Sequence, residues 1–387
     1  MQDILKALNV ESADERLQNL KSIIDEETEK PDFSDCFVNN QIHTTYSFSP
    51  YSPTAAVYCA RKATLPTAGI MDHDSIAGAW EFIRAGEIAG VETTVGIECR
   101  VRMDGTSVED RFINNQDQTG LAYMSLHGVP HGQIDKIQKV FEPLREKRNV
   151  RNRKMVDNIN SITEKDGITI DFDKDVLSVS QFRNGGTVTE RHIIFALSKK
   201  IVDVIGKDGT LSFLSDKLEI PLSQKHRDQL SDSDNPFFEY DLLGALKSEF
   251  VDRIYIPATD ECMHISQLSD LAKQTDSLLC YAYLGDVGTS VTGDKRSGRF
   301  EDSYLDELLY VLKGFSVDAV TYMPSRNTSA QLERIRKLCA ENEFFEISGE
   351  DINSPRQCFI CEQLANPEYR HLVDATWQLI RREKERS

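Results

Sequence analysis

Side chains that commonly bind metals recur directly after short apolar runs in the first third of the chain. Three of them, each after a run of strand length, are His43, His73 and Glu98. In a barrel of parallel strands, the carboxyl ends of the strands share one face, and active sites are built there. Histidine and carboxylate side chains are the usual ligands for divalent cations that assist hydrolysis. The pattern therefore predicts that these residues meet around a metal ion.

Strand-like and helix-like segments alternate on both sides of a central region. The first part, residues 37–129, contains apolar runs and helices expected near 52–63 and 75–88. The later part repeats the pattern with helices 265–273, 305–313 and 330–342 and strands 278–283, 319–322 and 344–347. Repeated strand-then-helix order favours a parallel α/β fold.

The chain divides into four predicted segments. We expect an N-terminal helical extension (1–30), a first barrel part (31–135), a mainly helical insertion or lid (136–255) and a second barrel part (256–387). The extension is expected to be one amphipathic helix, residues 4–27.

The insertion differs in texture from the flanking parts. It contains a basic cluster at residues 145–154, interpreted as a solvated helix face, a predicted short strand at 167–170 and a predicted polar loop at 224–236.

Charge and composition exclude several classes of protein. The 387 residues carry a net charge of −18, and an acidic surface repels phosphate backbones, so strong nucleic-acid binding is not expected. No apolar stretch has the length of a membrane span, and the start of the chain lacks the features of a signal peptide. The eight cysteines are scattered, which favours a reducing cytoplasm. The Cys358-x-x-Cys361 pair has no second pair to complete a structural zinc site.

Each candidate ligand also has a simpler interpretation. A single histidine after a strand is more often a packed, hydrogen-bonded side chain than a ligand. Asp72 and Asp74 could cap the helix expected near Ser75, and Glu98 could pair with Arg100. The agreement of several such residues in order favours the metal interpretation.

Four sequence segments carry a family resemblance: Gln41–Ser47 (QIHTTYS), Met71–Ser75 (MDHDS), Gly96–Glu98 (GIE) and Ser348–Asn353 (SGEDIN). Together they resemble the PHP (polymerase and histidinol phosphatase) family of metal-dependent phosphoesterases. The resemblance implies a distorted (β/α)7 barrel of the TIM-like type, interrupted by the helical insertion.

The resemblance also implies a ligand set. A first ion would be held by His43, Glu98, Asp351 and Gln41, the last standing where the family has histidine. A second ion would use Glu98 and His127, with Tyr283 in place of another histidine. A third site keeps His73 and has Asn353 in place of the final histidine. Glu98, His127 and Asp351 are accordingly the expected catalytic residues.

The substitutions change the expected metal. Amide oxygens are harder donors than imidazole nitrogen, so replacing histidine by Gln41 and Asn353 favours Mn²⁺ or Mg²⁺ relative to Zn²⁺. We expect one or two divalent ions rather than three.

Phosphate esters also require cationic partners, because charge shifts among their oxygens during hydrolysis. The candidates are Arg326 and Arg356, which follow late strands, and Arg191 and His192 from the insertion. His192 could alternatively cap its helix. Lys295, Arg296 and Arg299 are further candidates in the loop after Asp286.

The leading interpretation is a cytoplasmic metal-dependent phosphoesterase that hydrolyses a small phosphorylated substrate, such as a nucleotide or sugar phosphate, through a metal-activated water. The alternative is a catalytically impaired PHP-fold protein that binds a phosphorylated ligand or a partner without turnover. An exonuclease role is disfavoured by the acidic charge, and no membrane association is expected. The sequence does not indicate an oligomeric state.

Overall fold

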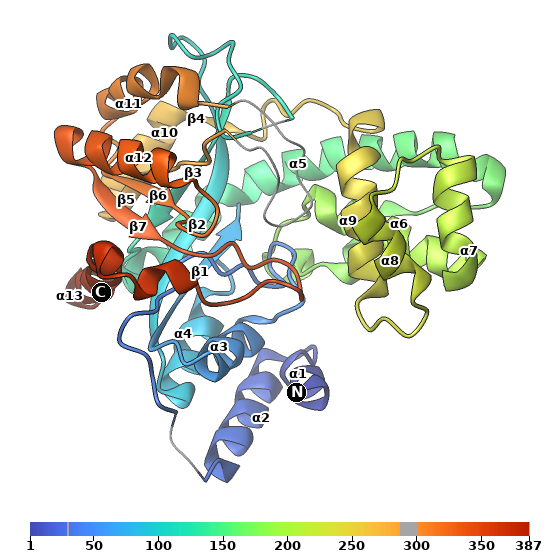
Figure 1. Cartoon of the computed structure of the whole chain (residues 1–387), viewed down its shortest axis with the longest axis horizontal. Coiled ribbons are helices and arrows are strands. Elements are labelled where there is room, and N and C mark those ends of the chain that lie inside the picture. Colours follow the sequence, from blue (N-terminus) through green and yellow to red (C-terminus); the bar gives the residue numbers. More distant parts are fainter. Residues whose placement is uncertain (29–30, 116, 287–299, 387) are drawn as a thin grey trace.

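A curled, mixed sheet of seven strands organises the fold (Figure 1). The computed structural model describes residues 1–28, 31–115, 117–286 and 300–386. The strands are β1 (Thr67–His73), β2 (Glu92–Arg102), β3 (Leu121–His127), β4 (Met263–His264), β5 (Leu278–Ala282), β6 (Ala319–Tyr322) and β7 (Phe345–Ser348). Their order is β1-β2-β3-β5-β6-β7, and β4 pairs with β2.

The sheet is parallel except at β3. This strand runs antiparallel to both of its neighbours, β2 and β5, so the expectation of a wholly parallel sheet is wrong there. The physical reason lies in the connection: residues 103–115 and 117–120 contain no helix between β2 and β3. A parallel neighbour needs a crossover, usually helical, whereas an antiparallel neighbour can follow a simple loop.

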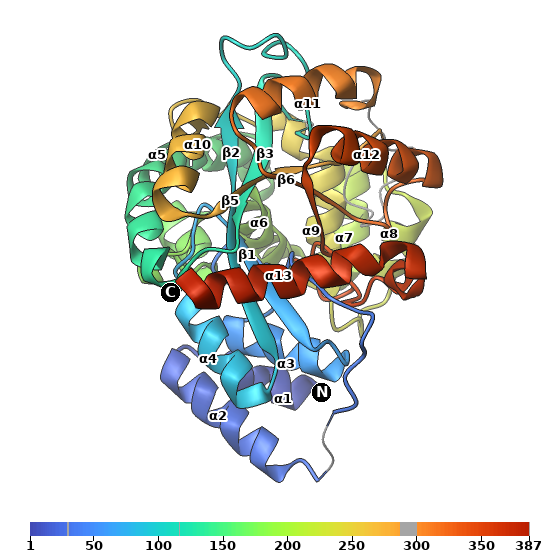
Figure 2. The same ribbon diagram turned by 90° about the vertical axis from the view of Figure 1, so that its left-hand side faces the viewer.

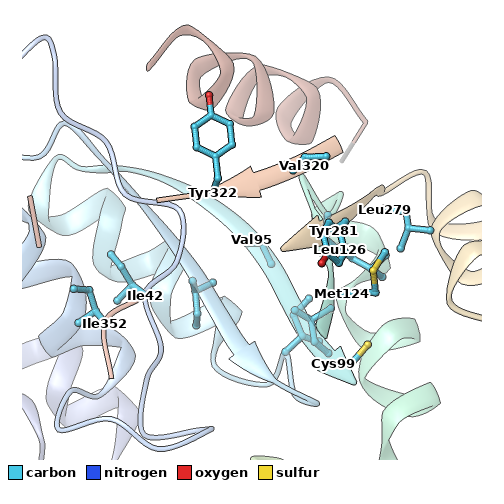
Figure 3. Packing of buried hydrophobic residues seen from close by; sticks show 14 of the residues in the cluster. Ile42, Val95, Cys99, Met124, Leu126, Leu279, Tyr281, Val320, Tyr322 and Ile352 are labelled. Carbon is cyan, nitrogen blue, oxygen red and sulfur yellow. The ribbon is translucent and has the colours of Figure 1, made fainter. Parts of the chain in front are cut away.

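Ile42 links the two ends of the sheet. It forms parallel bridges to Ile70 in β1 and to Ile352, which follows β7. The backbone N–H of His43 donates to the Ile352 carbonyl at 3.0 Å, and that of Ile352 donates to the Gln41 carbonyl at 3.0 Å. Figure 3 shows Ile42 and Ile352 side by side at the edge of the apolar core. The segment that ends at Ile42, expected to be a strand, thus contributes only Ile42 to the sheet, as a bridge residue.

Helices cover the outside of the sheet. They are α3 (Pro53–Lys62), α4 (Ala79–Ala89), α10 (Ile265–Thr275), α11 (Leu305–Gly314), α12 (Ser329–Asn342) and α13 (Arg370–Arg386). The last of these lies against β2 and β7 (Figure 2). The main core lies between these helices and the sheet and includes Leu126, Leu279 and Val320 (Figure 3).

A second group of helices projects to one side of the sheet (Figure 1). It comprises α5 (Ile134–Thr163), α6 (Glu190–Ile205), α7 (Lys207–Ser212), α8 (Gln224–Ser231) and α9 (Phe238–Glu249). These helices have a hydrophobic cluster of their own, which Phe48 joins from the opposite part of the chain. We call α5–α9 the helical region.

Two elements of the N-terminus replace the single expected helix. Helix α1 (Gln2–Leu8) and helix α2 (Ala13–Glu26) are separated at Asn9, whose amide donates to the Pro50 carbonyl and accepts from the Ser52 N–H. Ser12 then caps α2 by accepting from the Glu15 N–H. The Asn9 bonds to a distant segment and the Ser12 cap interrupt the helix where the 3.6-residue periodicity would continue it.

Two expectations for the helical region are also wrong. Residues 168–170 form no strand, because the side chain of Asn160 in α5 makes hydrogen bonds with both the N–H and the carbonyl of Ile170. Residues 224–231 of the expected polar loop form α8, which Ser223 caps by accepting from the His226 N–H.

No helix in the described part of the chain has the length and apolar character required to cross a membrane.

We predict that Gly349→Ala weakens the link between the ends of the sheet. A Cβ at this position would lie 2.6 Å from the Gln41 nitrogen and 2.8 Å from that of Asn40, both backbone atoms that side-chain motion cannot relieve. Overpacking of this kind costs about 1–3 kcal/mol of unfolding free energy, measurable by urea denaturation. The matched control is Gly314→Ala at the end of α11, where a Cβ meets no atom within 4 Å. Equal stability of the two variants would contradict the prediction.

Candidate metal centre

Three of the predicted ligands converge in the structure. Donor atoms of His43, His73 and Glu98 all lie within 4.8 Å of one another. His73 Nδ1 is 2.9 Å from Glu98 Oε2, and the imidazole rings of His43 and His73 stack with their centroids 4.5 Å apart. His43 and Glu98 are buried, and His73 is partly buried.

Asp351 joins this group from the far end of the chain. Its Oδ1 lies 3.1 Å from His43 Nε2, across the bridge that Ile42 forms with Ile352. The Asn353 side-chain amide donates to the same oxygen at 2.6 Å. The Gln41 amide donates to Glu98 Oε1 at 3.2 Å. Gln41, His43, His73, Glu98, Asp351 and Asn353 are thus linked by direct contacts.

The strands position these residues differently from the expectation. His73 ends β1, but Glu98 lies inside β2, which continues to Arg102. The parallel register pairs His73 with Glu98, so the two side chains lie on neighbouring strands at the same level. The contact is set by the register of the two strands rather than by a shared strand end. Residues paired in register point to the same face of the sheet, because successive residues along each strand alternate between the two faces.

The carboxylates raise the pKa of His43 above its ordinary value. Burial alone would lower that pKa, but Asp351, Glu98 and Asp72 favour the charged ring more strongly. Burial would likewise raise the pKa of Glu98, but His73 and His43 bring it below the ordinary value. The same carboxylates that favour a proton on His43 would favour a metal cation bound in its place.

Asp72 supports His43 through its neighbours. The carboxylate accepts from the Thr44 N–H at 2.7 Å, the Thr44 hydroxyl at 2.6 Å and the Ser47 hydroxyl at 2.5 Å. The Ser47 hydroxyl also lies 3.4 Å from His43 Nδ1. Asp72 therefore holds the loop that carries His43, and it does not cap α4, which begins only at Ala79.

His127 offers a buried ring nitrogen. Because β3 is antiparallel, His127 lies at the level of Leu278 at the start of β5. Among the described residues none makes a hydrogen bond to its Nε2, although the atom is buried. Burial lowers the pKa of His127 to about 4, so the ring is neutral near pH 7. A neutral imidazole with a buried lone pair fits a metal ligand.

A cavity of about 480 Å³ adjoins these residues. Its walls include Gln41, His73, Glu98, His127, Asp351 and Asn353, together with Arg148, Thr189, Glu190, Arg191 and Lys247 from the helical region and the residue before α6. All of the predicted ligands except His43 therefore line a space of the size that small-molecule sites occupy.

Tyr283 lines the same cavity, but its surroundings disfavour the ionised phenolate form. Its hydroxyl donates to Asp302 Oδ1 at 2.6 Å. Burial and this carboxylate raise the pKa of Tyr283 well above its ordinary value. It lies at the opposite end of β5 from the residue that pairs with His127.

A second cavity of about 390 Å³ shares Arg191, Asp351 and Asn353 with the first. Arg326 and Arg356 line it. Arg356 forms a two-point ion pair with Asp241 of α9, with both nitrogen–oxygen distances at 2.7 Å. Arg326 Nε donates to the Leu284 carbonyl at 3.3 Å. Arg356 thus ties the C-terminal part of the chain to the helical region.

His192 acts as a helix cap. It is buried in the first turn of α6, and its Nδ1 accepts from the Thr189 N–H at 3.0 Å. Burial lowers the pKa of His192 to about 3. It lines neither cavity described above, which supports the capping alternative. Lys295, Arg296 and Arg299 lie outside the described residues.

Half of the basic cluster of α5 is buried, so its interpretation as a solvated face is wrong for three of its six residues; Lys147, Arg153 and Lys154 are exposed. Arg145, Arg148 and Arg151 lie inside the protein. Arg148 and Arg151 pair with Glu190, and Arg151 Nε lies 2.5 Å from Glu261. The spacing of three residues, which aligns side chains on one helix face, was the available signal. Arg100 of β2 joins this network by pairing with Glu190 and Glu261. The sequence had allowed a pair between Arg100 and Glu98 instead.

The residues present fit one or two divalent ions. Imidazole nitrogens of His43 and His73 and carboxylate oxygens of Glu98 and Asp351 make a mixed donor set that suits a divalent cation. The buried Nε2 of His127, without a protein partner in the described chain, is the observation that most favours a ligand there.

Comparison with known proteins supports the fold. No family model matches the chain, and no curated protein matches it significantly. A candidate metal-dependent phosphoesterase from Bifidobacterium adolescentis has a similar structure, with a TM-score of 0.56 and 17% identity over 89% of this chain and 95% of that one. The structure of an amidohydrolase from Chromobacterium violaceum, with bound sulfate and no metal, is also similar. Its TM-score is 0.54, with 13% sequence identity over 87% of this chain and 96% of that one. The chain therefore has a fold like that of metal-dependent hydrolases.

Glu301 holds one wall of the first cavity. This buried carboxylate accepts from the Tyr281 hydroxyl at 3.0 Å, the Leu284 N–H at 2.8 Å and the Gly285 N–H at 3.1 Å. These bonds fix the turn that follows Tyr283. Burial nevertheless raises the pKa of Glu301 to about 7.

We predict that this carboxyl makes stability depend on pH. The native state holds the proton more tightly than the unfolded state, so the unfolding free energy falls as pH rises from about 4.5 to about 7. The contribution is about 3 kcal/mol. Urea denaturation at several pH values should show a slope that Glu301→Gln reduces. An identical pH profile in both proteins would contradict it.

Proposed function

We propose that this protein is a metal-dependent phosphoesterase acting on a small phosphorylated molecule. The observation that carries the proposal is the convergence of His43, His73, Glu98 and Asp351 beside a cavity of about 480 Å³. The PHP resemblance and the similar structure of a candidate phosphoesterase support the choice of reaction.

His43, Glu98 and Asp351 would hold a first ion, and Glu98 with His127 a second. When bound, such ions polarise a phosphoryl oxygen and lower the pKa of water. Glu98 contributes a carboxylate that is ionised at neutral pH, because His73 and His43 hold its pKa low. Gln41 and Asn353 orient the two carboxylates through their amide hydrogen bonds.

Cationic side chains of the helical region suit a phosphorylated substrate. Arg191 and Lys247 line the same cavity as Glu98 and Asp351, where positive charge would stabilise phosphoryl oxygens. The helical region would therefore serve as a lid that selects the substrate and excludes water. A cavity of this volume accommodates a nucleotide or a sugar phosphate.

One observation favours the alternative of binding without turnover. The amide groups of Gln41 and Asn353 donate to Glu98 and Asp351, so their N–H groups, rather than their oxygens, face the ligand carboxylates. Donation of this kind weakens the carboxylates as metal ligands. Such a protein would retain the cavity and bind a phosphorylated ligand.

We predict that the wild-type protein binds one or two Mn²⁺ ions per chain and that His43→Ala weakens binding at least about 10–100-fold, because it removes a central nitrogen donor. Elemental analysis and calorimetric titration measure the two quantities. His264→Ala is the control, since His264 caps α10 and lies outside both cavities. Three ions per chain would contradict the expected count.

We predict hydrolysis of p-nitrophenyl phosphate in the presence of Mn²⁺. His43→Ala and Glu98→Ala should each lower kcat/KM about 100-fold, equivalent to about 2.7 kcal/mol of transition-state stabilisation. Release of p-nitrophenol gives the rate, and His264→Ala should retain activity. Equal background rates in wild type and both ligand variants would favour the binding protein.

A further inference from the structure

The residue after His73 has an unusual backbone. Asp74 has a φ of +50°, in the left-handed region that residues other than glycine seldom adopt. Backbone strain of this kind persists only where surrounding contacts determine the conformation. Because Asp74 is covalently joined to His73, those contacts also help to fix the backbone position from which the imidazole projects.

Three separate groups of Asp74 are held. Its N–H donates to the Glu98 carbonyl at 2.8 Å, which joins it to the neighbouring strand. Its carbonyl accepts from Arg145 Nη1 at 3.2 Å. Its carboxylate accepts from Arg148 Nη1. Two of the three contacts thus come from buried arginines one turn apart on α5, which belongs to the helical region.

Arg148 also contacts a residue of the helical region that lines the cavity. Its Nη2 donates to Glu190 Oε2 at 2.9 Å, at the first residue of α6. Glu190 and the next residue, Arg191, both line the cavity. A single guanidinium therefore spans from the turn after His73 to the residues that face the substrate space. The planar fork of arginine makes such a two-carboxylate bridge possible.

We propose that Arg148 is a positioning residue of the metal centre: it fixes the Asp74 turn, and through it His73, and couples that turn to the helical wall at Glu190. The inference rests on the proposed function for the presence of an ion. It adds that the helical region shapes the metal centre as well as the substrate cavity.

The test compares Arg148→Gln with Arg153→Gln. Arg153 lies on the same helix but is exposed and pairs with Asp173, so it is a matched control. Co²⁺ replaces the native ion and reports ligand geometry through its visible absorption. We expect Arg148→Gln to weaken Co²⁺ binding at least about tenfold and to shift the absorption band, and Arg153→Gln to change neither.

A second measurement does not need the metal. Hydrogen exchange of the apoprotein, followed by mass spectrometry, should be at least about tenfold faster for residues 70–78 in Arg148→Gln than in Arg153→Gln. Wild-type protein that shows no Co²⁺ absorption band would contradict the proposed function. The exchange comparison would still test whether Arg148 holds the Asp74 turn. Equal exchange in the two variants would overturn it.

Arg148→Lys covers the case in which the glutamine variant does not fold. It retains the positive charge, but one ammonium group does not reproduce the fork between Asp74 and Glu190. We expect a folded protein with several-fold weaker Co²⁺ binding and a shifted band. A lower melting temperature with a wild-type Co²⁺ spectrum, in either Arg148 variant, would show a purely structural role and overturn the inference.

Discussion

The backbone bridges of Ile42 are the interaction on which the candidate site depends. By pairing with both Ile70 and Ile352, this residue joins the first strand to the segment after the last one. The same hydrogen bonds place His43 beside Asp351, although the two residues are far apart in the sequence. The close approach of Gly349 to the Gln41 backbone belongs to the same junction, because a larger residue would not fit there. The metal centre is therefore a product of how the curled sheet ends.

The helical region and the sheet form one electrostatic unit. Arg148 and Arg151 of α5 both pair with Glu190 at the start of α6. Arg148 also pairs with Asp74, which follows β1, and Arg151 with Glu261, which precedes β4. Buried charges are tolerated only when they are paired, and removing one partner leaves the other uncompensated. The network fixes the wall of the cavity that faces the ligands. The proposed substrate selection and the proposed ligand geometry would thus depend on the same buried arginines.

The sequence predicted some features well, and their physical basis is local. The helices around the sheet could be recognised because apolar periodicity is visible within a few residues, and short motifs pointed to His43, His73, Glu98 and Asp351, which the structure brings together. The antiparallel direction of β3 was missed, since strand direction depends on the connection and not on the strand. The N-terminal break and α8 depended on hydrogen bonds of Asn9 and Ser223 that a periodicity pattern does not contain.

By itself, the sequence determined which residue types are available for a metal centre and roughly where helices and strands lie, because these follow from composition and short-range pattern. Only the tertiary structure decided that β1 and β2 pair His73 with Glu98 and that Arg145, Arg148 and Arg151 of α5 are buried. Register, burial and charge pairing depend on contacts between segments far apart in the chain. No local pattern contains that information.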